Sequence, residues 1–171
     1  MIDFSRAIEL PCPPAKVWDV LGNLHTIESC LPGFEHTQEV EPRRRYRVRI
    51  RDRIGSYHVD IPLDVVVDSL ETGARLAVKA SGRDKVLASA VKVSMTVALA
   101  AADVGASLTL QGRLEVGGKL AALGEGVLGR KMRDTLHDFA ANLERLLNPS
   151  RDADATERPR TDDAPQNGVD T

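Results

Sequence analysis

A chain of 171 residues with 42% hydrophobic side chains is long enough to bury one substantial core, and its formal net charge of −2 gives no strong field. That balance argues against nucleic acid as a partner, because nucleic-acid-binding domains usually carry a basic surface. The sequence contains no run of about eighteen apolar residues and no signal-peptide core at its start, so we expect a cytoplasmic protein. Cys12 and Cys30 lack metal-binding spacing, which predicts reduced thiols and no metal site.

The first part of the chain predicts a strand followed by two short helices. Apolar and polar side chains alternate over 2–10, as in a half-buried strand, and Arg6 is the one charged residue on the apolar side. Pro14 suits the first position of a helix that would run to Leu21. A second short helix is expected over 27–31, just before a Pro-Gly pair.

The middle of the chain predicts strands separated by turns. Period-two patterns indicate five further strands, over 45–51, 57–67, 76–80, 91–99 and 108–116. If the first of these hairpins closes at 53–56, Ile50 lies opposite Val59 and Arg49 lies opposite Asp60.

A row of arginines from Arg43 to Arg53 occupies the polar face of the first of these strands. Such a row could bind phosphate or a membrane surface. The predicted register places carboxylates opposite it, which favours the plainer interpretation of a solvated outer face with cross-strand ion pairs.

The last predicted element is one long amphipathic helix from Leu120 to Leu147, where apolar residues recur every three or four positions. Gly124, Gly126 and Gly129 lie within it, and each costs about 1 kcal/mol relative to Ala inside a helix. We interpret them as the wall of a pocket.

The end of the chain has a different composition. Residues 148–171 follow the helix with six acidic residues, three arginines and one large aliphatic side chain. Such a segment cannot bury enough apolar surface to become ordered. We therefore expect a folded domain over 1–147 and a disordered polar tail over 148–171.

These elements predict an α+β fold in which the long helix covers the apolar face of one antiparallel sheet. Aromatic residues make up only 4% of the chain, so few bulky side chains can fill the space between sheet and helix, and a cavity for an apolar ligand is expected. Strand parity and the helix stripe give the predicted ligand-binding residues: Phe34, Tyr46, Val48, Ile61, Leu63, Val78, Val93, Met95, Leu120, Leu123, Gly124 and Val127. Arg6 is the candidate polar contact, and Asp52 is a second charged residue with inward parity.

Catalytic signals are weak. The four histidines, His25, His36, His58 and His137, are scattered, and two of them fall on polar faces, so no triad or general base is indicated. We expect no enzymatic activity, no cofactor and no metal.

Three stretches carry a resemblance to a known family. They are I-E-L-P-C-P-P-A-K-V-W over 8–18, C-L-P-G-F-E over 30–35 and G-G-K-L-A-A-L-G over 117–124. Over roughly residues 2–147 the chain resembles the CoxG proteins of the carbon monoxide dehydrogenase system, which are helix-grip domains of the START and Bet v 1-like group. The resemblance implies a curved antiparallel sheet of six to seven strands wrapped on a long C-terminal helix, two short helices after the first strand, and a hydrophobic cavity.

The resemblance also implies a function. It indicates a non-enzymatic carrier of a lipid or an isoprenoid quinone such as menaquinone, accessory to a molybdenum hydroxylase of the carbon monoxide dehydrogenase type. Transient contact with the inner face of the membrane would follow. The alternatives are a polyketide cyclase or aromatase-like enzyme, and an assembly or adaptor factor that uses its outer surface.

Overall fold

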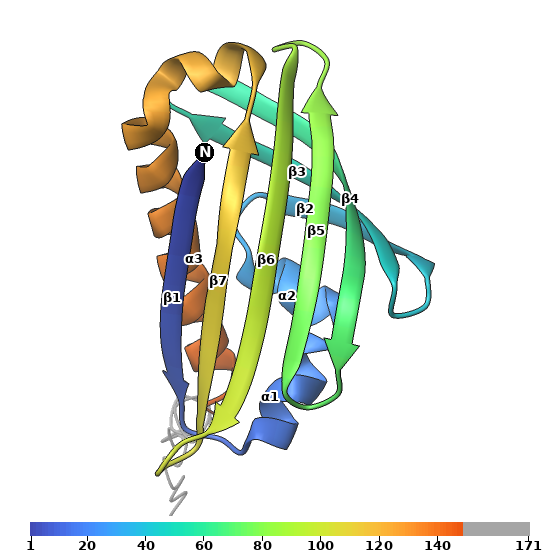
Figure 1. Cartoon of the computed structure of the whole chain (residues 1–171), viewed down its shortest axis with the longest axis vertical. Helices are drawn as coiled ribbons and strands as arrows, with labels where there is room; N and C mark the ends of the chain where they lie inside the picture. The colour runs from blue at the N-terminus through green and yellow to red at the C-terminus, as the bar shows by residue number, and fades with distance from the viewer. Residues whose placement is uncertain (149–171) are drawn as a thin grey trace, which may run out of the picture.

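Seven antiparallel strands curve around a long C-terminal helix in the computed structural model, which describes residues 1–148 (Figure 1). The elements in chain order are β1 (Ile2–Leu10), α1 (Pro14–Leu21), α2 (Leu24–Cys30), β2 (Phe34–Glu41), β3 (Arg45–Ile54), β4 (Tyr57–Glu71), β5 (Arg75–Asp84), β6 (Ser89–Ala101), β7 (Ala106–Val116), the 3-10 helix η1 (Gly118–Leu123) and α3 (Gly124–Leu146). The strands lie in the order β1-β7-β6-β5-β4-β3-β2. The predicted helix-grip fold is confirmed. Residues 149–171, which hold nearly all of the predicted tail, lie outside the described residues.

Strand parity determines which face of the sheet packs on the helix. In β1 the even positions Phe4, Ile8 and Leu10 are buried, while the odd positions between them are exposed. Successive side chains of a strand point to opposite faces, so the same alternation gives the other strands one inner, apolar face and one outer, polar face. α1 and α2 lie behind the sheet, on the side of α3 (Figure 1).

Two predictions for the segment before β3 need correction. The second short helix runs from Leu24 to Cys30 and not over 27–31, because the Asn23 side chain accepts hydrogen bonds from the backbone N–H groups of His25 and Thr26 and caps an earlier start. The strand β2 was not expected, since its residues are mostly polar and alternate poorly. It forms a bulged edge strand, with His36 at a positive φ of 51°.

The register of the β3–β4 hairpin differs from the predicted one by two residues. Ile50 lies opposite Ile61, and Arg49 lies opposite Pro62, because the strands are joined by the two-residue loop at 55–56 and not by a turn that closes at 53–56. A shift of two leaves each side chain on its predicted face. Val48 is accordingly buried, whereas Arg47 is exposed.

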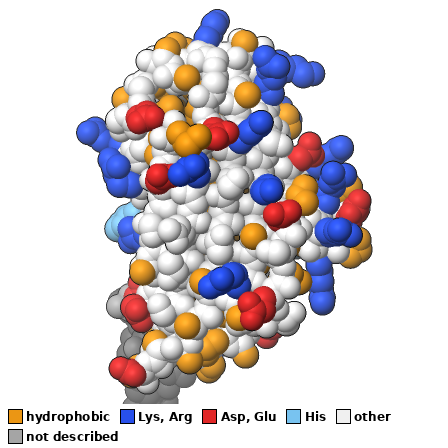
Figure 2. All heavy atoms as spheres, viewed as in Figure 1, with side chains coloured by type: hydrophobic (Ala, Val, Ile, Leu, Met, Phe, Trp, Pro, Cys, Tyr) orange, Lys and Arg blue, Asp and Glu red, His pale blue; other side chains and the backbone are white. Residues whose placement is uncertain are grey.

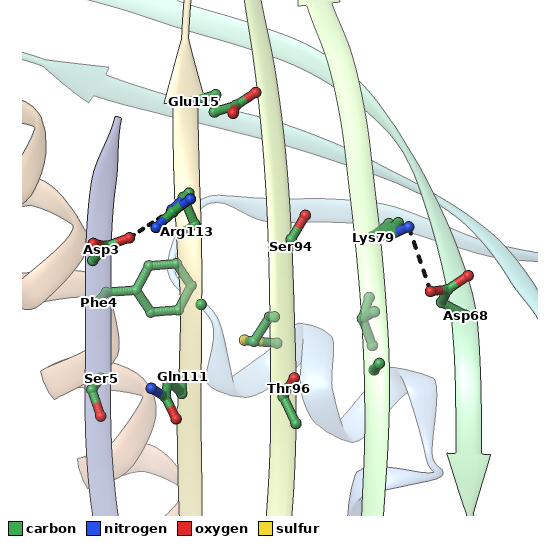
Figure 3. Close-up of a pocket in the computed structure, with 14 residues that line it drawn as sticks. Asp3, Phe4, Ser5, Asp68, Lys79, Ser94, Thr96, Gln111, Arg113 and Glu115 are labelled. Carbon is green, nitrogen blue, oxygen red and sulfur yellow. Dashed lines mark hydrogen bonds and ion pairs between the residues drawn. The ribbon is translucent and has the colours of Figure 1, made fainter.

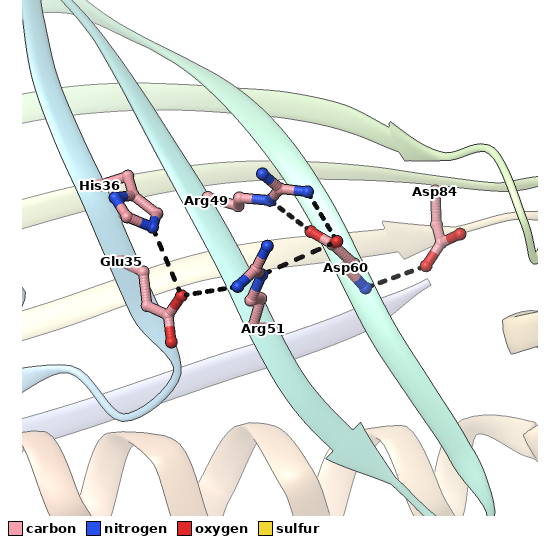
Figure 4. Close-up of polar contacts among 6 residues, drawn as sticks. All are labelled: Glu35, His36, Arg49, Arg51, Asp60 and Asp84. Carbon is pink, nitrogen blue, oxygen red and sulfur yellow. Dashed lines mark hydrogen bonds and ion pairs between the residues drawn. The ribbon is translucent and has the colours of Figure 1, made fainter.

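The outer face of this hairpin carries a network of ion pairs (Figure 4). Arg49 donates two hydrogen bonds to Asp60, from Nε to Oδ1 at 2.6 Å and from Nη2 to Oδ2 at 2.7 Å. Arg51 lies 3.8 Å from Asp60 and 3.6 Å from Glu35, and Arg47 lies 3.4 Å from Asp64. The solvated, ion-paired interpretation is thus confirmed for these three arginines.

The apolar interior consists of two clusters of buried side chains. The larger joins β1, β6 and β7 to the first helices and to α3, through residues such as Ile8, Leu108 and Leu143. The smaller comprises Val59, Ile61, Leu63, Leu87 and Leu120, which join β4 and the β5–β6 turn to η1. Val91 and Val116 pack against both clusters but remain half-buried themselves. The inner face is therefore sealed at two ends and less completely between them.

The predicted single helix from Leu120 to Leu147 is interrupted. Residues 118–123 form η1, and α3 begins only at Gly124, whose φ of 86° breaks the helical path. Gly126 is exposed with open space around it, and Gly129 is buried against Ile2 of β1. The three glycines therefore have separate roles, and the interpretation of all three as one pocket wall is wrong.

η1 is fixed against the β5–β6 turn by close backbone contact. Gly118 has a φ of 78°, and a Cβ there would collide with the carbonyl oxygen of Ala88. The buried Ser89 hydroxyl accepts a hydrogen bond from the Leu120 N–H at 3.0 Å and donates one to the Leu87 carbonyl. The G-G-K-L stretch therefore turns the chain from β7 into η1, and only glycine fits the second position.

Gly118→Ala should destabilise the protein by about 2 kcal/mol or more, because the substitution combines backbone strain with a steric clash. Thermal unfolding should show a fall in Tm of at least about 4 °C. Gly126→Ala is the matched control, and its Tm should stay equal or rise, since Ala has the higher helix propensity. Equal Tm values for the two variants would contradict this account of η1.

The Asp60 pair predicts a pH-dependent contribution to stability. The hydrogen bonds from Arg49, aided by the charges of Arg49 and Arg51, hold the pKa of Asp60 below its usual range despite partial desolvation. A carboxyl whose pKa is lower in the folded state stabilises the fold above its unfolded pKa of about 3.9, and this contribution disappears as the pH falls through the folded pKa. Asp60→Asn should therefore lower the Tm at pH 7, and the difference from wild type should vanish below about pH 3.

Melting curves of the wild type and Asp60→Asn between pH 7 and pH 2 measure this effect. Asp103→Asn, in the exposed β6–β7 turn, is the control and should give a difference that does not change with pH. A constant difference for Asp60→Asn would show that the pair does not act through its charge.

Candidate functional site

The inner face of the middle strands carries apolar side chains that are not fully buried. One cross-strand row consists of Tyr46, Val65, Ala80 and Val93, each opposite the next in β3, β4, β5 and β6. All four have inward parity, yet all four are half-buried. The neighbouring row holds Val67, Val78 and Met95, which are also half-buried.

The position of α3 explains this partial exposure. Its backbone lies against β1, η1 and α2 and reaches β3, but within the described residues it makes no comparable approach to β4, β5 or β6. The apolar stripe of the helix, with Leu136, Phe139 and Leu143, is used on the β1 side. The middle strands therefore present apolar surface that the helix does not cover.

The predicted ligand-binding residues fall into three groups. Val48, Ile61, Leu63 and Leu120 are buried, with at most 7% of their surface exposed. Inward and half-buried are Phe34, Tyr46, Val78, Val93, Met95 and Leu123. Gly124 forms the η1–α3 junction, and Val127 is 44% exposed on the first turns of α3. The structure brings the second group to the inner face and leaves Val127 at the surface; contact of any of them with a ligand stays a prediction.

The two inward charged residues lie at opposite sides of α3. The Arg6 Nη2 atom lies 3.4 Å from Nδ1 of the exposed His137 on α3, so the guanidinium leaves the inner face and passes the helix edge. The Asp52 carboxylate forms an ion pair of 2.7 Å with Lys131, also on α3. Asp52 thereby ties the end of β3 to the helix, close to the turn at Gly33.

Two titratable groups stay protonated near neutral pH. Burial raises the pKa of the Tyr46 hydroxyl, the Glu39 carboxylate raises it further, and Arg43 partly opposes both. Burial also raises the pKa of the Cys30 thiol, which a hydrogen bond with Ser29 opposes. A thiol with a raised pKa is a poor nucleophile. Within residues 1–148 no group of three or more metal-binding side chains comes together.

Sequence reasoning missed one polar group on the inner face. The Thr37 hydroxyl of β2 is buried, and within residues 1–148 it has no hydrogen-bond partner. No sequence signal could have identified it, because its orientation depends on the bulge at His36 and on a strand that the pattern did not predict.

The outer face carries a second candidate site, an open trough of about 810 Å³ that crosses four strands (Figure 3). Its floor is the cross-strand row Phe4, Gly112, Met95 and Val78, whose side chains point inward or are absent. One wall holds the ion pairs Asp3–Arg113 and Lys79–Asp68, with Ser94 and Glu115. The other wall holds Ser5, Gln111, Thr96 and Ala77. Acidic and basic side chains are interspersed over this face, with pale areas of small polar side chains and backbone between them (Figure 2).

A smaller hollow of about 360 Å³ lies on the outer face of the β3–β4 hairpin, lined by Arg51, Asp52, His58, Val59 and Asp60. Its charged side chains already belong to the ion-pair network or to the Asp52–Lys131 pair. It therefore offers less free recognition chemistry than the inner face.

Solved structures share the architecture of this chain. A conserved protein from Geobacillus kaustophilus matches with a TM-score of 0.78 and 20% identity, covering 87% of this chain and 97% of that one. Protein CV1439 from Chromobacterium violaceum matches with a TM-score of 0.64 and 14% identity, covering 87% and 99%. Ara h 8.0201 matches with a TM-score of 0.60 and 19% identity, covering 85% and 97%. At these identities the likeness establishes the fold.

Sequence comparison identifies the family. No curated protein matches the chain. Among the helices of residues 1–148, none combines the length and the apolar character needed to span a bilayer. The family model of CoxG, a carbon monoxide dehydrogenase protein, matches residues 7–148, which covers the sheet, both short helices and α3. The chain therefore belongs to the carbon monoxide dehydrogenase CoxG family.

Proposed function

We propose that this protein is a non-enzymatic carrier that binds a hydrophobic small molecule, a lipid or an isoprenoid quinone, between the sheet and α3. The observation that carries the proposal is the set of inward apolar side chains, Val65, Val78, Val93 and Met95, that α3 leaves half-buried. Apolar surface that faces a helix but stays accessible is best covered by an apolar guest.

The chemistry of the inner face supports binding more than catalysis. Its charged residues are engaged at the margins, Arg6 beside His137 and Asp52 with Lys131. General acid or base chemistry needs titratable groups that converge on a substrate. A cyclase or aromatase activity therefore has less support from these residues than carriage of a ligand.

The family description supports a role beside a redox enzyme. We infer that the carrier is accessory to a molybdenum hydroxylase of the carbon monoxide dehydrogenase type, in the cytoplasm or at the inner face of the membrane. The outer trough favours a second candidate, an adaptor that docks on the enzyme, because it offers neutralised ion pairs and small polar side chains over four strands. Both roles can belong to one protein, since the two sites lie on opposite faces of the sheet.

Extraction of the purified protein with organic solvent, followed by mass spectrometry, tests the carrier. A lipid or quinone recovered in stoichiometric amount, and absent from an extract of a heat-denatured and washed sample, is the expected result. An empty protein that also fails to bind added quinones or lipids would refute the proposal.

Ala80→Phe should weaken binding of an apolar probe, because the added ring would occupy the inner face between Val65 and Val93. We expect the affinity for 1-anilinonaphthalene-8-sulfonate, measured by its fluorescence, to fall at least about tenfold, or about 1.4 kcal/mol. Ala77→Phe is the matched control, since Ala77 lies on the same strand but faces the outer trough. Its affinity should equal that of the wild type, and equal losses in both variants would place the probe elsewhere.

A further inference from the structure

The Thr37 hydroxyl is a buried polar atom that the protein itself does not satisfy. Its Oγ1 atom is buried, and no donor or acceptor of residues 1–148 lies within hydrogen-bond distance. Buried hydroxyls in folded proteins are nearly always hydrogen-bonded, because an unpaired one loses its interaction with water and gains nothing. An exception in a protein that binds small molecules points to a partner supplied from outside the chain.

The local geometry directs this hydroxyl to the inner face. The pairing of β2 with β3 shifts between Glu35 and Gln38, so that His36 and Thr37 together lie opposite Val48. His36, with its positive φ, is exposed and contacts Glu35 on the outer face (Figure 4). Gln38 lies opposite the outward Arg47, so the residue before it has inward parity, beside the buried Val48.

The surroundings of Thr37 make one end of the inner face polar. Tyr46 and Glu39 lie opposite each other one step further along the same strand pair, and Tyr46 is half-buried with inward parity. From Tyr46 the cross-strand row continues through Val65 and Ala80 with no polar side chain. The inner face is thus polar at β2 and β3 and apolar at β4, β5 and β6.

We propose that the Thr37 hydroxyl hydrogen-bonds an oxygen atom at one end of the ligand, whose apolar remainder lies on β4, β5 and β6. The inference rests on the proposed carrier function and narrows it to one ligand class, apolar molecules that end in a carbonyl or hydroxyl oxygen. Pure hydrocarbons would leave the hydroxyl unpaired, so the site selects against them.

Two probes that share a carbon skeleton test this selectivity. 2-Acetylnaphthalene carries a ketone oxygen, and 2-ethylnaphthalene carries two hydrogens in its place. Displacement of 1-anilinonaphthalene-8-sulfonate gives the affinity of each. In the wild type the ketone should bind about tenfold more tightly, and in Thr37→Val this preference should disappear while the affinity for 2-ethylnaphthalene stays the same or rises.

Three controls separate the hydroxyl from general damage. Thr37→Ser keeps a hydroxyl and should keep the preference. Thr96→Val removes a hydroxyl from the outer trough and should also keep it. The melting temperature of ligand-free Thr37→Val should equal or exceed that of the wild type, because the variant loses an unpaired buried group.

Each contrary result has a distinct meaning. If neither naphthalene binds the wild type, the carrier function fails, and this inference fails with it. If both bind equally, or if Thr37→Val keeps the preference, the carrier stands and the role of Thr37 is refuted. A marked fall in the melting temperature of Thr37→Val would show that the hydroxyl is already satisfied, which also overturns the inference.

Discussion

The architecture follows from a mismatch between a curved sheet and a single helix. Seven strands present a continuous apolar inner face, and one helix of 23 residues cannot contact all of it. α3 packs its buried stripe along β1, where Leu136 and Leu143 join Ile8 and Leu108 in one cluster. The strands furthest from that contact are covered only where η1 inserts Leu120 beneath β4. Apolar surface therefore remains accessible between the two clusters, and the candidate site is the consequence.

The spacing between helix and sheet is maintained by polar contacts around η1. The buried Asp84 carboxylate accepts hydrogen bonds from the Leu87 N–H at 2.9 Å and from the Asp60 N–H at 3.0 Å, where β4 has separated from β5. Ser89 then binds the first turn of η1 through the Leu120 N–H. These groups are fully used in holding the turn, so the glycine-rich motif carries a structural task. At the other end of the helix, Asn142 donates to the Cys30 carbonyl and ties α3 to α2.

The polar side chains divide between the two faces of the sheet in a way that relates to function. On the outer face, arginines are matched by carboxylates, and exposed pairs of this kind contribute little free energy but keep the surface neutral. On the inner face, the polar groups are few and gather at β2 and β3. An apolar ligand with one oxygen-bearing end would match that distribution, while the neutral outer face remains free for a protein partner.

The sequence by itself determined the faces of the strands, the fold class and the family. Alternation along a strand is a property of the covalent backbone, so Val48 and Met95 could be assigned to the inner face before any contact was known. The register of the β3–β4 hairpin could not, because it depends on where the turn closes, and a shift of two residues leaves the pattern unchanged. β2 escaped prediction because an edge strand buries too little to require alternation.

Only the tertiary structure decided which inward residues are packed and which remain accessible. Ile61 and Val93 have the same parity and similar chemistry, yet one is 3% exposed and the other half-buried, because η1 covers one and α3 misses the other. The break at Gly124 and the orphaned hydroxyl of Thr37 likewise depend on how distant segments meet. Periodicity records the direction of a side chain; its partners are set by packing between elements far apart in the chain.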